Sequence, residues 1–75
     1  MTTPETVTDA VATELRAAIG RKNLSRRGLA AKMQKNPQWV WRRLNGDQPL
    51  TVADVVLICR AIDVDPMTVL DHALT

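Results

Sequence analysis

The stretch LSRRGLAAKMQKNPQWVWRRLNG, residues 24–46, contains two short helical patterns joined by a very short connection. Ser25 predicts the start of the first helix, because serine is a favoured N-cap residue. Asn36 followed by proline predicts the start of the second, and Gly46 is suited to close it in a left-handed conformation. Helices connected so tightly cross at a steep angle, so the second helix is expected to project from the domain.

The remainder of the chain also carries apolar residues at helical spacing, and it shows no sustained alternation typical of a strand. Thr51 and Asp54 predict a capping box, and Asp65 followed by proline predicts the start of the last helix. The fold class is therefore all-α, in one domain spanning residues 1–75. We expect helices at about 4–22, 26–34, 37–45, 52–62 and 66–74.

Composition limits the class of protein. With 75 residues, of which 45% are hydrophobic, the chain suits one small folded domain. Its apolar runs are too short for a membrane span, and its beginning lacks the order of a signal peptide. Cys59 is the single cysteine, which excludes an internal disulfide and suits a reducing cytoplasm, where we expect the protein to act.

Charge is strongly segregated along the chain, although the net charge is only +2. Nine of the ten Lys and Arg residues lie within residues 16–43, and all eight acidic residues lie outside that segment. Such a basic segment favours binding to a polyanion, most often nucleic acid. The alternative is a set of basic helices that are simply well solvated.

The helix expected at 37–45 has an apolar side and a polar side. Helical periodicity places Val40, Leu44 and Pro37 on the buried side. The two tryptophans of the chain lie on the flanks, where we expect both to pack mainly against the domain. The outward face consists of Gln38, Arg42 and Asn45.

This outward face has the chemistry needed to contact bases. In the major groove of DNA, glutamine pairs with adenine and arginine with guanine, and Gln38 and Arg42 lie four residues apart on one face. Trp41 is expected to contact a sugar or a thymine methyl as well. The alternative is that any exposed helix face carries such residues. The predicted base-contacting residues are Gln38, Arg42, Asn45 and Trp41.

Backbone phosphates are expected to bind at the helix starts, where amide groups and the helix dipole favour anions. The arginines after Ser25 add full charges there, and the connection between the two helices adds a lysine. Such contacts position a protein without carrying sequence information. The predicted phosphate-binding residues are Ser25, Arg26, Arg27, Lys35, Asn36 and Arg43.

The order of these features resembles the lambda-repressor/Cro-like helix-turn-helix family over about residues 15–74. The resemblance rests on Leu24-Ser25, Leu29-Ala30, the valine at 40, Asn45-Gly46 and the later pattern V..IC.AI.VDP..VL. It implies a compact five-helix domain in which the second and third helices form the helix-turn-helix. It also implies a small repressor or Cro-like regulator that binds an operator in double-stranded DNA.

Two residues depart from the family pattern. Gln34 stands in the turn where the family usually has glycine, and Arg26 stands where it usually has glutamine. A glutamine in that turn is expected to need a strained left-handed conformation, unless the turn is longer. The arginine-rich composition is similar to that of proteins from GC-rich actinobacteria or from phages and prophages.

Other functions find little support in the sequence. His72 and Cys59 have no partner at ligand spacing, so we expect no catalytic residue, no metal and no cofactor. Two alternatives to the regulator remain: a protein-interaction module such as an antitoxin, and a nonspecific nucleic-acid binder. The last helix has surplus apolar residues, so Met67 and Leu74 are expected to support a weak homodimer, or pairing on DNA alone.

Overall fold

The computed structural model describes residues 4–75, which form five α-helices and no strand. This confirms the predicted all-α class. Three of the helices end one residue earlier than expected. The helices are α1 (Pro4–Arg21), α2 (Arg26–Met33), α3 (Pro37–Asn45), α4 (Val52–Ala61) and α5 (Pro66–Leu74).

The predicted capping residues begin four of the helices. The side chains of Ser25, Asn36 and Asp65 each accept a hydrogen bond from a backbone amide in the first turn of the helix that follows. Thr51 and Asp54 form the capping box of α4. Because each cap satisfies an amide that has no partner within its helix, the sequence defines these boundaries locally.

Left-handed residues end the helices and turn the chain. Gln34 has φ 57° and ψ 40° directly after α2, as expected for a non-glycine residue in that turn. Gly46 closes α3 at φ 88°, and Asn23 and Asp63 adopt φ values of 56° and 60° after α1 and α4. This conformation costs about 1 kcal/mol or more for Gln34, whereas asparagine and aspartate adopt it more readily.

A single apolar core lies between the helices. Leu15 of α1, Leu29 of α2, Val40 of α3 and Ile58 of α4 are fully buried, and Val69 of α5 is nearly so. One side chain from every helix thus enters the same core. A buried Leu, Ile or Val contributes about 1.5–3 kcal/mol. These contacts therefore fix the positions of α2 to α5, which at 8–10 residues are too short to be stable alone.

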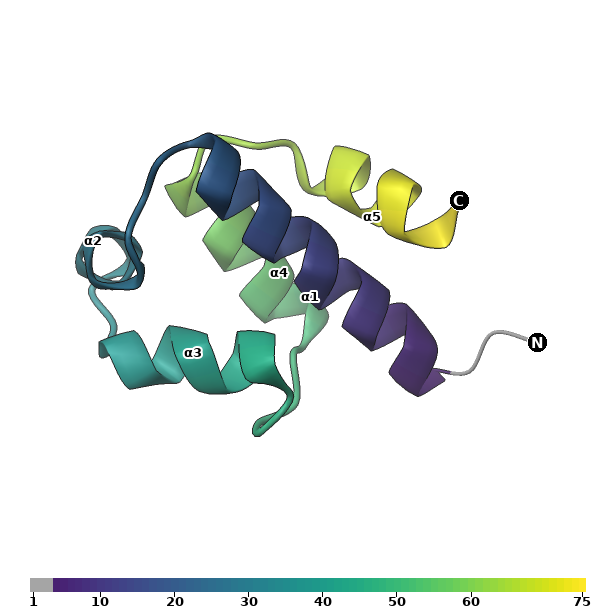
Figure 1. Ribbon diagram of the computed structural model, residues 1–75, viewed down its shortest axis with the longest axis horizontal. Helices are drawn as coiled ribbons and strands as arrows, with labels where there is room; N and C mark the ends of the chain where they lie inside the picture. The colour runs from purple at the N-terminus through teal and green to yellow at the C-terminus, as the bar shows by residue number, and fades with distance from the viewer. Residues whose placement is uncertain (1–3) are drawn as a thin grey trace.

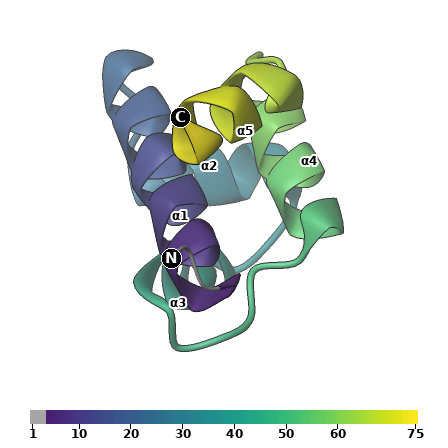
Figure 2. The same cartoon turned by 90° about the vertical axis from the view of Figure 1, so that its right-hand side faces the viewer.

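The arrangement leaves α2 and α3 at one end of the molecule. In Figure 1, α2 is seen end-on at the left and α3 lies across the view below it. Helix α5 lies on the opposite side of α1 from α3. Figure 2 again shows α3 at the bottom and α5 at the top. Helix α1 contacts α3, α4 and α5, and α2 packs against α3 and α4. Within residues 4–75, no helix has the length and hydrophobicity needed to cross a membrane.

Candidate nucleic-acid interface

Helix α3 presents a polar strip to solvent. Val40 and Leu44 hold the opposite side of the helix in the core, as periodicity predicted. The strip consists of exposed side chains that make no hydrogen bond or ion pair within the described part of the chain, so all their donors and acceptors are available to a ligand. Its residues are Gln38, Arg42 and Asn45.

Pro37 does not lie on the buried side, contrary to the prediction. It is exposed in the structure. As the first residue of α3, it lies before the turn in which Val40 reaches the core. Periodicity gives the direction of a side chain, but burial also requires another element to lie in that direction.

Both tryptophans lie half-buried on the flanks of α3, as expected. Trp39 packs against the core, and its ring has the Nζ of Lys35 at 5.2 Å and the guanidinium of Arg43 at 3.9 Å from its centre. The ring of Trp41 has the guanidinium carbon of Arg26 at 3.2 Å from its centre. The ring of each tryptophan thus forms a cation–π contact with at least one basic side chain.

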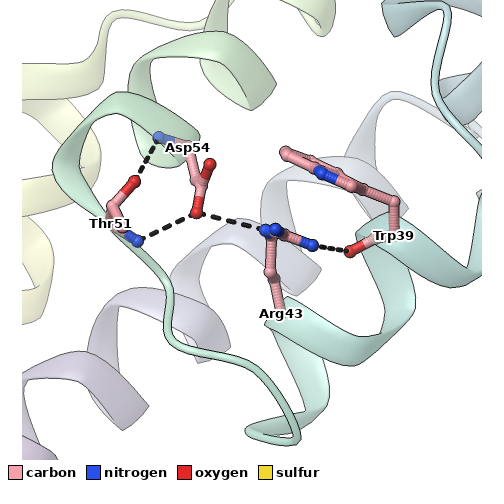
Figure 3. A network of polar contacts seen from close by, with 4 residues as sticks. All are labelled: Trp39, Arg43, Thr51 and Asp54. Carbon is pink, nitrogen blue, oxygen red and sulfur yellow. Dashed lines mark hydrogen bonds and ion pairs between the residues drawn. The ribbon is translucent and has the colours of Figure 1, made fainter.

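Arg43 has intramolecular partners that the sequence analysis missed. Its Nε lies 3.2 Å from Oδ2 of Asp54, and its Nη1 donates to the carbonyl of Trp39 at 3.1 Å (Figure 3). The same Asp54 oxygen accepts from the amide of Thr51 at 3.0 Å. The side chains of Arg43 and Asp54 are only 22% and 14% exposed.

These contacts change the interpretation of Arg43. Its guanidinium connects α3 to the start of α4, so a DNA phosphate would have to compete with a mostly buried carboxylate. Arg43 is therefore unsuited to the phosphate contact expected from the sequence. No local sequence signal reveals this pair, because the two residues lie on different helices and meet only in the folded domain.

Arg16 is a second basic residue held within the domain. Its Nη1 donates to the carbonyl of Leu44 at 2.5 Å, and its Nη2 donates to Oγ1 of Thr13 at 3.2 Å. The carbonyl belongs to the last turn of α3, where the helix dipole favours a cation. Arg16 therefore fixes the end of α3 on α1.

The start of α2 retains groups that can bind an anion. The first hydrogen bond of α2 runs from the amide of Leu29 to the carbonyl of Ser25, so the amides of Arg26 and Arg27 have no acceptor within the helix. The Ser25 hydroxyl accepts from the amide of Gly28 at 2.9 Å but keeps its own proton to donate.

Asn36 also keeps an unused hydrogen-bond donor at the start of α3. Its Oδ1 accepts from the amide of Gln38 at 2.8 Å, which leaves the Nδ2 group as a donor. Lys35 is exposed in the turn just before it. The residues predicted to bind phosphate, other than Arg43, thus each keep at least one donor that no hydrogen bond within residues 4–75 uses.

Comparison with known proteins assigns the family. A model of the family described as "Helix-turn-helix domain" matches residues 10–72. The chain belongs to this helix-turn-helix family. The crystal structure of the clp gene regulator ClgR from C. glutamicum is similar, with a TM-score of 0.82 and 20% sequence identity, covering 91% of this chain and 88% of that one. At this identity the likeness concerns the fold. No curated protein matches the sequence significantly.

Proposed function

We propose that this helix-turn-helix domain is a sequence-specific binder of double-stranded DNA and a transcriptional regulator in the cytoplasm, of the small repressor or Cro-like kind. The observation that carries the proposal is the unpaired polar strip of α3, which lies opposite its core-facing side. An α-helix fits the major groove, and such a strip meets the edges of the bases there. The proposed function includes no catalytic step.

Base contacts come from the strip itself. Gln38 and Arg42 lie one turn apart, so they reach neighbouring base pairs, and Asn45 extends the strip to the end of the helix. Neither Gln38 nor Arg42 must give up a partner within residues 4–75 in order to bind. The free-energy cost of binding through these side chains is therefore mainly their lost conformational entropy and the removal of their bound water.

Phosphate contacts come from the two helix starts beside the strip. Three of these contacts come from Lys or Arg, so log Kd should rise with log salt concentration with a slope of about 3, because each phosphate neutralised by a cation releases counterions. They hold the protein in register while the strip selects the sequence. The proposed residues are Ser25, Arg26, Arg27, Lys35 and Asn36.

Selection from a pool of random-sequence duplexes tests the proposal. An enriched motif supports it, whereas uniform, salt-sensitive binding would indicate a nonspecific nucleic-acid binder. No binding would indicate that the fold serves protein interaction, as in an antitoxin. The double variant Gln38→Ala/Arg42→Ala is the matched control: both side chains are exposed, so the domain should fold normally but enrich no motif.

We also propose that two copies pair on DNA, because one short helix contacts only a few base pairs. Met67 and Leu74 of α5 are 68% and 66% exposed, on a helix at the other end of the molecule from α3. Sedimentation with a palindromic duplex should give two copies per duplex, and Met67→Glu should reduce this to one. One wild-type copy at saturation, without preference for symmetric sites, would contradict the pairing.

A further inference from the structure

The two arginine–tryptophan stacks differ in what the guanidinium N–H groups do. Arg43, stacked on Trp39, donates to Asp54 and to the Trp39 carbonyl. Arg26, stacked on Trp41 at 3.2 Å, donates no hydrogen bond within the described part of the chain. The first stack belongs to the internal framework of the domain. The second holds a cation whose hydrogen-bonding capacity is unused.

Stacking is compatible with phosphate binding because it uses a different part of the guanidinium. The ring contacts the flat face of the group, whereas its five N–H donors lie in the plane and point outward. A phosphate binds these N–H donors. Trp41 can therefore fix the position of the Arg26 guanidinium and leave its donors available.

The location of the stack suits this role. Arg26 is the first residue of α2, beside the amides that have no acceptor within the helix. Trp41 lies on α3, and its half-buried ring lines a hollow together with Leu24 and Leu29. Because Trp41 is half-buried, its ring has less freedom than a fully exposed side chain and provides a surface on which the flexible arginine can be ordered.

We infer that Trp41 is a positioning residue: it holds the Arg26 guanidinium in place for a DNA phosphate and does not itself select a base. This inference rests on the proposed function and replaces the base contact expected for Trp41. A free arginine loses rotamer freedom when it binds. Prior ordering on the ring removes part of that loss and so increases affinity for every duplex alike.

A double-mutant cycle on duplex binding tests the inference. Trp41→Leu keeps an apolar side chain over the hollow but removes the ring, Trp41→Phe keeps a ring face, and Arg26→Met keeps most of the stem without the charge. Trp41→Leu should weaken binding about threefold on specific and nonspecific duplexes, because the Arg26 side chain must then be ordered at the moment of binding. Trp41→Phe should restore most of the affinity. In the Arg26→Met background, Trp41→Leu should have no further effect.

A second readout needs no DNA. The ring current of Trp41 should shift the NMR signals of the Arg26 side-chain protons in the free protein. Trp41→Leu should abolish this shift and Trp41→Phe should retain part of it. Trp39→Leu is the matched control, because it removes the other stack and should leave the Arg26 signals in place.

Three results would overturn the role of Trp41. Equal losses from Trp41→Leu with and without Arg26 would mean that the ring acts independently. A loss of affinity confined to one base pair would indicate that Trp41 contacts a base. Arg26 signals without a ring-current shift would show that the stack does not form in solution. Failure of the wild type to bind any duplex would overturn the proposed function together with this role, whereas binding without coupling would overturn this role alone.

Discussion

Replacing Asp54 by alanine is expected to destabilise the domain by about 2 kcal/mol. Its Oδ2 accepts from Arg43 Nε at 3.2 Å and from the Thr51 amide at 3.0 Å. A hydrogen bond to a charged group contributes about 1.5–3 kcal/mol, and the partial exposure of this pair places it at the lower end. Loss of the capping contact adds about 0.5–1 kcal/mol.

Thermal unfolding measures this effect. For a domain of this size, about 1 kcal/mol corresponds to 4–8 °C, so Asp54→Ala should lower Tm by about 8–16 °C. Asp54→Asn keeps an acceptor for Thr51 and should lose about half as much. Asp47→Ala is the matched control, since it removes an acidic side chain that is exposed and makes no hydrogen bond or ion pair within residues 4–75.

A second variant shows whether the stability lost in Asp54→Ala comes from the pair of Arg43 and Asp54. Arg43→Met keeps the stem beside Trp39 and removes the charge. Combined with Asp54→Ala it should show a coupling of about 1 kcal/mol or more, because the two residues lose the same interaction. A coupling below about 0.3 kcal/mol is what independent residues show, and it would contradict a stabilising interaction between Arg43 and Asp54. So would an Arg43→Met variant with unchanged Tm and a salt dependence reduced by about one unit, which would make Arg43 a phosphate contact.

Three further predictions concern separate parts of the domain. Arg27→Ala should weaken binding to all duplexes alike and reduce the salt dependence by about one unit, and a base-specific loss would contradict a phosphate contact. Gln34→Gly should raise stability by about 0.5–1 kcal/mol in thermal unfolding, because glycine adopts the left-handed turn without strain; an unchanged or lower Tm would contradict this. Burial, and to a smaller extent the charge of Asp65, raises the pKa of the Cys59 thiol. The thiol therefore ionises near its ordinary pKa only in the unfolded chain, so the free energy of unfolding should fall as pH rises above about 8.5. Cys59→Ala should reduce that fall.

Local signals in the sequence predicted most of the fold. The caps at Ser25, Asn36 and Asp65 depend on residues two or three positions away, so they can be recognised without knowing the tertiary structure. The left-handed conformation of Gln34 was one of two possibilities suggested by the glycine that the resembling family has in that turn. Helical periodicity placed Val40 and Leu44 correctly on the buried side of α3, but it also placed the exposed Pro37 there.

Contacts between helices were not predictable in this way. The pair of Arg43 and Asp54 depends on how α3 packs beside α4, and the stack of Arg26 on Trp41 depends on the crossing of α2 and α3. A charge count treats all nine residues of the basic segment as equivalent. The structure separates Arg16 and Arg43, which hold the domain together, from those with free donors.

Affinities measured for all four bases at each position of the selected site show whether α3 selects the DNA sequence. Arg42→Ala should cost about 1–3 kcal/mol on the preferred site and remove the preference at one base pair. Gln38→Ala should do the same at a neighbouring pair, with the remaining positions unchanged. If both variants instead lose affinity equally for every sequence, the outward face of α3 contacts only the DNA backbone, and the proposal of sequence-specific recognition through α3 is contradicted.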